Sequence, residues 1–192
     1  METLVVCTAT AASVLLFSLA GWLTRAGYWR VAAALLGGLV AAGFAFALDY
    51  AAFEFGWWSY GHMEIHAPVA TYASTALWFG AGLGLVGWRI MRNWGGVGEG
   101  LFFLLFPLLG LARDFAMAAS GVGFSFGAGW VPVAVSAAGW LAIAFIVQLV
   151  MQLLVGGVDA DPLEPEHLPM LDPVSWPLDA GDAESRFVIG RD

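Results

Sequence analysis

The sequence contains no lysine, only one cysteine, and few charged residues of any kind. All seven basic residues are arginine, and charged residues occupy 11% of the 192 positions, against roughly 25% in soluble domains. The lone Cys7 excludes an internal disulfide and any site built from several cysteines. A glycine-rich phosphate-binding loop is also absent. We expect neither a cofactor nor a nucleic-acid partner.

Hydrophobic residues, in contrast, are abundant and occur in long runs. They occupy 60% of the chain, more than a soluble domain of this size could hide from water. Four or five runs meet the criterion of about 20 apolar residues for each helical crossing of a bilayer. These runs cover residues 4–23, 31–48, 69–88, 101–119 and 131–155. The sequence therefore predicts an all-α, polytopic transmembrane bundle of about five helices in the cell membrane, surrounded by lipid.

Arginine flanks alternate connections between these runs. Arg25 and Arg30 lie in the first connection and Arg89 and Arg92 in the third, whereas the second and fourth contain no arginine. Because basic residues favour the cytoplasmic side, the first and third connections are predicted to lie inside. The first run, which has no basic residues before it, is read as a retained helix and not a signal peptide. The N-terminus then lies outside and, with five crossings, the C-terminus lies inside.

Most of the acidic charge gathers in the C-terminal segment. After residue 156 the chain has nine of its fifteen acids and two arginines, a net −7 of the formal −8. Proline is frequent there and no apolar helical stripe is present, a composition typical of disorder. We therefore expect a transmembrane bundle over residues 1–156 and a disordered, acidic, soluble tail over residues 157–192. The tail could recruit a protein partner.

Charged side chains are costly inside a bilayer, so the few near the apolar runs are the candidates for function. Asp49 ends the second run and Glu54 follows it. Arg113 and Asp114 lie in the fourth run, and the predicted orientation brings all four residues toward the outer side. Neighbours on a helix point about 100° apart, so we expect Arg113 to pair with Asp49 or Glu54 instead of Asp114. The group is either an interhelical ion pair or contains a carboxylate that donates a proton to a substrate.

His62, Glu64 and His66 alternate within the second connection. On an extended segment these three side chains would share one face, where they could bind a metal ion. On a helix they would not, and no further set of ligands is evident. Solvated histidines in a polar connection are the simpler alternative.

Gly80 and Gly84 form a GxxxG motif inside the third run. Small residues at this spacing let a neighbouring helix approach closely. The neighbour is either another helix of the same chain, which we favour, or a second copy in an oligomer.

Two stretches carry a family resemblance. Asp49 is followed by Gly-Trp-Trp-Ser-Tyr at 56–60 and by a proline-led helix from Pro68, and a second stretch at 99–103 places Glu99 ahead of two phenylalanines. Together they resemble small integral-membrane carotenoid enzymes of the lycopene-cyclase-domain type. The resemblance implies proton-dependent cyclisation or hydration of a polyene, with Asp49, Glu54 and Glu99 as the proton-handling positions. The family's acidic motif usually has a proline and paired glutamates, where this chain has Gly98 and a single glutamate.

Three functions stay open at this point. The first is an enzyme that acts on a lipid-soluble isoprenoid or carotenoid, with Asp49, Glu54, Asp114 and Glu99 as candidate catalytic acids. The second is a transporter of ions or small molecules, although the first and third runs contain few ionisable residues and no inverted repeat is evident. The third is a non-enzymatic membrane subunit or assembly factor whose tail recruits a partner.

Overall fold

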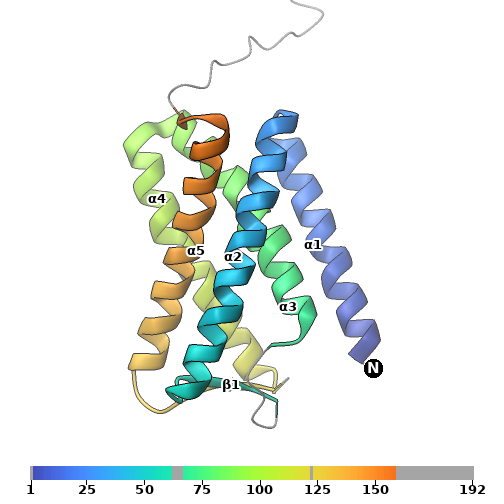
Figure 1. Ribbon diagram of the computed structural model, residues 1–192, viewed down its shortest axis with the longest axis vertical. Helices are drawn as coiled ribbons and strands as arrows, with labels where there is room; N and C mark the ends of the chain where they lie inside the picture. The colour runs from blue at the N-terminus through green and yellow to red at the C-terminus, as the bar shows by residue number, and fades with distance from the viewer. Residues whose placement is uncertain (1, 62–66, 122, 159–192) are drawn as a thin grey trace, which may run out of the picture. The chain divides into compact units, whose positions relative to one another are not determined.

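The computed structural model describes residues 2–61, 67–121 and 123–158, which are mostly helical (Figure 1). Two long helices, α1 (Glu2–Thr24) and α2 (Tyr28–Glu54), come first in the chain, and a third long helix, α5 (Val131–Val155), comes last. Between α2 and α5, the helices α3 (Val69–Ser74), η1 (Thr75–Gly82) and α4 (Leu83–Ala119) follow one another without a break. The all-α prediction is therefore right in outline.

Three helical stretches of the described chain are long and apolar enough to cross a membrane. They are Tyr28–Glu54, Val69–Ala119 and Val131–Val155, and Thr10–Thr24 within α1 is a shorter apolar helix. The outer surface is correspondingly rich in large apolar side chains, such as Leu15, Leu104 and Leu153. In water this surface would be unfavourable, whereas hydrocarbon solvates it well. The length and composition of these helices and the apolar outer surface therefore support the prediction of a membrane protein.

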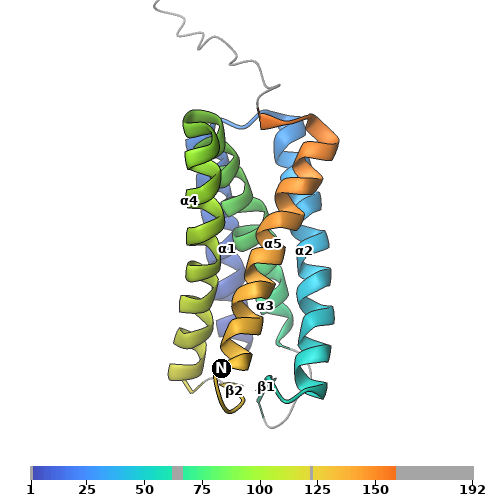
Figure 2. The same cartoon turned by 90° about the vertical axis from the view of Figure 1, so that its left-hand side faces the viewer.

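The long stretch Val69–Ala119 reverses direction at Gly95. This glycine has φ 54° and ψ −137°, a conformation outside the helical region that only glycine adopts without strain. The two arms of α4 then lie side by side, because a Cβ on Gly87 would meet the Phe102 ring and a Cβ on Gly98 would meet the Ile90 carbonyl oxygen. Figure 2 shows this turn at the end of the bundle away from β1 and β2.

The interior of the bundle is built on a stripe of small residues along α2. Its buried positions include Ala33, Ala34, Gly37, Gly38 and Ala41, which recur at the spacing of one helix face. Lipid provides no hydrophobic driving force between helices, so association depends on such close packing. The stripe receives α5 and η1 as its main neighbours.

The closest helix contact joins α2 to η1, which is an eight-residue π-helix. A Cβ on Gly38 would overlap the Ala76 carbonyl oxygen, and a Cβ on Gly80 would lie 2.6 Å from the Gly38 Cα. Gly84, one turn later, packs against Val147 of α5. The GxxxG glycines therefore serve packing within the chain, the alternative favoured from the sequence, and their surfaces are already occupied.

A small antiparallel ladder covers one end of the bundle, which the sequence did not predict. β1 (Trp58–Tyr60) pairs with β2 (Phe124–Phe126), with Ser59 opposite Ser125. The side chains of Trp58, Tyr60 and Phe124 are buried beneath this ladder. We call β1 and β2 together the cap, because they join the α2–α3 connection to the α4–α5 connection (Figure 2).

Several predicted features lie outside the described residues. His62, Glu64 and His66 are among them, and so is the acidic segment from residue 159 onward. The predicted runs themselves were mostly too short. The second run, for example, was expected over 31–48, whereas α2 extends over Tyr28–Glu54, because aromatic and polar residues at a helix end are no obstacle to helix formation.

Substituting Gly38 by alanine should destabilise the bundle, because the new methyl group would overlap the Ala76 carbonyl. We expect a loss of about 1–3 kcal/mol, the usual cost of overpacking, seen as a lower melting temperature in detergent. Gly43→Ala is the matched control, since it lies on the same helix with nothing within 4 Å of the added Cβ. Equal melting temperatures for the two variants would contradict the close contact.

Candidate functional site

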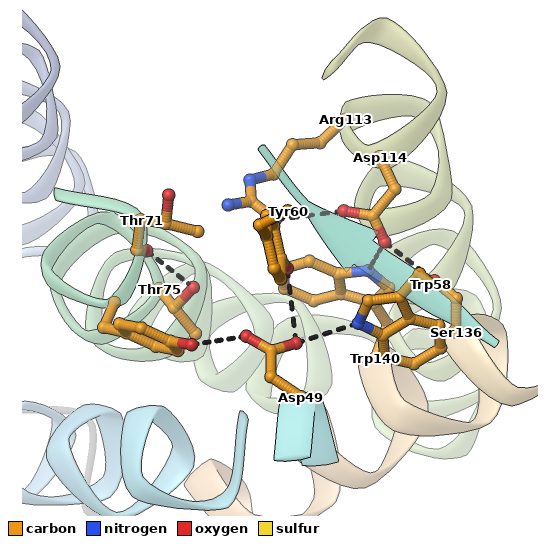
Figure 3. A network of polar contacts seen from close by, with 10 residues as sticks. Asp49, Trp58, Tyr60, Thr71, Thr75, Arg113, Asp114, Ser136 and Trp140 are labelled. Carbon is orange, nitrogen blue, oxygen red and sulfur yellow. Dashed lines mark hydrogen bonds and ion pairs between the residues drawn. The ribbon is translucent and has the colours of Figure 1, made fainter. Parts of the chain in front are cut away.

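A cavity of about 50 Å³ with several polar side chains in its wall lies beneath the cap and between five helical elements, α2, α3, η1, α4 and α5. Its lining includes two acidic side chains, Asp49 from α2 and Asp114 from α4, and one basic side chain, Arg113. Thr71, Thr75 and Ser136 add hydroxyl groups. Figure 3 shows these side chains pointing toward one another from separate elements. The interior of the bundle is mostly apolar, and these polar side chains lie together in it.

Asp49 is buried, and its carboxylate accepts hydrogen bonds from three aromatic side chains. The indole N–H of Trp58 donates to Oδ1 over 3.0 Å, and the hydroxyl of Tyr60 donates to the same oxygen over 3.2 Å. The hydroxyl of Tyr72 donates to Oδ2 over 2.5 Å. Donors to both oxygens compensate the carboxylate for the water that it loses on burial.

The position of Asp49 follows from the helix that carries it. Ala45 and Asp49 are one turn apart, and Ala52 continues the same buried side of α2 toward the helix end. The chain then turns through Gly56, which has φ 66°, and returns over the end of the bundle as β1. Alternation along β1 directs Trp58 and Tyr60 to the same face, so both reach Asp49.

Tyr72 connects the carboxylate to the start of α3. Its hydroxyl donates to Asp49 and accepts a hydrogen bond from the Ala67 backbone N–H over 3.1 Å. Its ring packs edge-on against Phe46, with 5.6 Å between the ring centroids. One phenol therefore joins α2, α3 and the segment before Pro68.

Asp114 is the second buried carboxylate, and its donors come from α4 and α5. Oδ2 accepts a 2.7 Å hydrogen bond from the Ser136 hydroxyl and a 2.8 Å bond from the Trp140 indole. Oδ1 accepts from Arg113 Nη1 over 3.0 Å, which is also an ion pair. Ser136 and Trp140 are four residues apart, so both face α4 from one side of α5.

The prediction that Arg113 would avoid its neighbour Asp114 is wrong. The two Cβ atoms do diverge on the helix, but the arginine side chain is long enough to fold back to the carboxylate. The guanidinium also lies over two aromatic rings, with 5.5 Å from its carbon to the centroid of Phe79 and 5.3 Å to that of Trp140. These contacts hold the cation at the edge of the cavity.

Burial raises the pKa of the Tyr60 phenol far above its usual range, and the nearby Asp49 carboxylate raises that pKa further. Ionisation would place a phenolate in a poorly solvated position beside another anion. Tyr60 therefore keeps its proton through the physiological range and remains a hydrogen-bond donor to Asp49.

The other two candidate acids lie elsewhere. Glu54 is exposed at the last position of α2, and it does not line the cavity. Glu99 is exposed four residues beyond Gly95, and Figure 2 shows this turn of α4 at the end of the bundle away from the cap. Of the acids proposed from the sequence, the structure brings only Asp49 and Asp114 together. No group of three metal-binding side chains occurs among residues 2–61, 67–121 and 123–158.

Sequence reasoning missed the donors that hold the two carboxylates. Tyr72, Ser136 and Trp140 were not among the predicted site residues, and Trp58 and Tyr60 lie just after a helix end, where aromatic side chains typically anchor a helix at the membrane surface. Trp22 and Trp130, which are 74% and 77% exposed, do fit that description, whereas Trp58 is 6% exposed. One signal was available, because Ser136 and Trp140 form a polar pair at helical spacing inside an apolar run.

Asp114→Asn should destabilise the protein strongly, because it leaves the Arg113 guanidinium without its charge partner. We expect a loss of about 2–4 kcal/mol for breaking a largely buried pair, measured by thermal unfolding in detergent. The double variant Arg113→Gln/Asp114→Asn should regain part of that loss. If the double variant is less stable than Asp114→Asn alone, the ion pair does not account for the cost. Glu99→Gln, at an exposed position, serves as the control.

Stability should decrease with rising pH above about 10, where free tyrosine ionises. Below that pH Tyr60 is protonated in both the folded and the unfolded chain. Above it the unfolded chain releases the Tyr60 proton while the folded chain retains it, so unfolding becomes more favourable. Tyr60→Phe removes this contribution, and its melting temperature should fall less between pH 9 and 11 than that of the wild type. Parallel pH profiles would contradict a protected phenol.

Comparisons with known proteins do not place the chain in a family. A scan against protein-family models finds no match. Searches of curated proteins and of solved structures also find none.

Proposed function

We propose that this chain crosses the cell membrane five times, with its N-terminus outside and its C-terminus inside. The reversal at Gly95 supports this count, because it divides the longest helical stretch into two arms. The placement of arginine supports the orientation: Arg30 and Arg92 both lie over the Trp88 ring, with their guanidinium carbons 3.7 and 5.2 Å from its centroid. The basic connections are thus at one end, and the positive-inside rule assigns that end to the cytoplasm.

Within this topology the cavity is an acid–base site for the end of a lipid-soluble isoprenoid or carotenoid. The observation that carries this proposal is that two buried carboxylates from different helices, Asp49 and Asp114, line the same cavity. Ionisable groups inside a membrane are costly to keep, so such a pair indicates a function. The resemblance around Asp49 and the 56–60 segment points to the same chemistry.

The two carboxylates differ in their surroundings, which suggests different roles. Asp114 forms an ion pair with the Arg113 guanidinium, so it orients that side chain. Asp49 receives its hydrogen bonds from a tryptophan and two tyrosines, whose hydroxyls can also pass protons. Asp49 with Tyr60 and Tyr72 is therefore the proton-handling group. The rings of Trp58 and Trp140 on the cavity wall would stabilise a cationic intermediate.

The size of the cavity limits what can react there. A volume of about 50 Å³ has room for only a few water molecules, since one water needs roughly 10–15 Å³ of such space. A whole carotenoid does not fit, so only the end of a chain would reach Asp49, after side chains move. Hydration, the addition of water to a terminal double bond, requires less space than cyclisation, the formation of a ring.

A non-enzymatic membrane subunit is the second candidate. The observation that favours it is the completeness of the hydrogen bonding, since each carboxylate has three donors within the chain. A network of this kind can hold helices together without any substrate. Deletion of the gene, followed by complementation with single variants, separates the two functions.

The test is an isoprenoid and pigment profile of a strain from which the gene has been deleted, complemented with single variants. Asp49→Asn should reduce the product by about 100-fold or more, the usual contribution of a positioned acid or base. Glu54→Gln and Glu99→Gln are matched controls outside the cavity and should restore the profile fully. Protein levels in the membrane are measured for each strain. An unchanged profile in the deletion strain would rule out the enzyme.

A further inference from the structure

The wall of the cavity is not equally buried on all sides. The side chains from the cap and from α5 are almost completely enclosed, including Trp58, Phe124 and Trp140 at 6%, 5% and 6% exposure. Partial exposure appears instead on α2, α3 and α4, where the partly exposed lining residues are Ala45, Leu48, Thr71, Tyr72 and Arg113. The Arg113 side chain is 18% exposed.

The helix packing explains why this side is open. α3 packs mainly against α1, η1 and α2, and the second arm of α4 packs against α5. Figure 3 shows Thr71 and Arg113 facing each other from two separate ribbons, with the cavity residues beneath them. The boundary between α3 and α4 is therefore the thin part of the wall.

This boundary lies close to the ends of both helices. Thr71 is two residues after the start of α3, and Arg113 is six residues before the end of α4, so both are within about 10 Å of a helix end at 1.5 Å per residue. In a bilayer with a core of about 30 Å, that is the level where acyl chains meet headgroups. An arginine is tolerated at this level, because its guanidinium can reach polar surroundings while its methylenes remain in lipid.

We propose that the cavity opens sideways to the bilayer between α3 and α4, and that its ligand enters from the lipid past Thr71 and Arg113. The cap seals the cavity from the aqueous side, so a ligand dissolved in the membrane has the shorter route. The ligand class is an apolar chain with a small polar or unsaturated end group, which matches the water-sized cavity. This inference rests on the proposed function for its ligand, but the opening itself can be tested without any substrate.

The single cysteine makes a labelling experiment direct. Cys7 is exposed on α1, and Cys7→Ser gives a background with no thiol, into which Thr71→Cys introduces one labelling site. A bimane fluorophore on that thiol is studied in vesicles with two quenchers: phosphatidylcholine with a doxyl group at acyl carbon 5, and aqueous acrylamide. Leu108→Cys, 53% exposed on α4, is the lipid-facing control, and Ser125→Cys, exposed on the cap, is the water-facing control.

The proposal predicts that the label at Thr71 is quenched by the doxyl lipid at least half as strongly as the label at Leu108. Acrylamide should quench the Thr71 label several-fold less than the Ser125 label. Stronger quenching by acrylamide than by lipid would mean that the cavity opens to water, and weak quenching by both would mean that the wall is closed. Either result overturns the proposal.

A second probe of different chemistry guards against an artefact of the bimane label. The methanethiosulfonate spin label at Thr71, with oxygen and a water-soluble nickel chelate as collision partners, distinguishes lipid from water in the same way. The result is independent of the pigment profile. If lipid quenches the label and deletion of the gene leaves the pigment profile unchanged, the lateral opening is supported and the proposed enzymatic function is ruled out. If water reaches the label and deletion changes the profile, the lateral opening is ruled out and the enzymatic function is supported.

Discussion

A carboxylate buried in an apolar helical bundle must find its hydrogen-bond donors within the chain, because apolar surroundings offer none. Asp49 and Asp114 meet this requirement with donors from β1, α3 and α5. Each hydrogen bond fixes the distance between two elements, so the arrangement of this end of the bundle follows from the two acids. The cap lies where it does because Trp58 and Tyr60 must reach Asp49, and Arg113 folds back because Asp114 needs a counter-charge.

The same helix provides both the tightest contact and the cavity. Near the middle of α2, Gly38 lets the backbone of η1 approach closely, and this contact leaves no free space. Two to three turns further along, Ala45, Leu48 and Asp49 line the cavity. At this level polar groups from six elements take the place of glycine and alanine. The close packing of α2 against η1 at Gly38 therefore holds these helices at the spacing that the cavity around Asp49 requires.

The outline of the fold could be read from the sequence, because long apolar runs, scarce charge and Pro132 in the first turn of α5 are local signals. Asp49 and Asp114 were found by the same reasoning, since an acid near a span is conspicuous. Their donors were missed because tyrosine and tryptophan near a helix end are typical of membrane anchors. The cap was missed too, since its two three-residue strands are paired across 66 positions, as at Ser59 and Ser125. A contact of that kind leaves no local pattern.

The central claim is that Asp49 and Asp114 belong to one site. The most direct test is the coupling between Asp49→Asn and Asp114→Asn in thermal unfolding, measured as a double-mutant cycle in detergent. Both carboxylates line the cavity together with Arg113, so the loss from the double substitution should differ from the sum of the single losses by at least about 0.5 kcal/mol. Additive effects, equal to the sum within about 0.3 kcal/mol, would show two independent structural acids and would contradict the shared site.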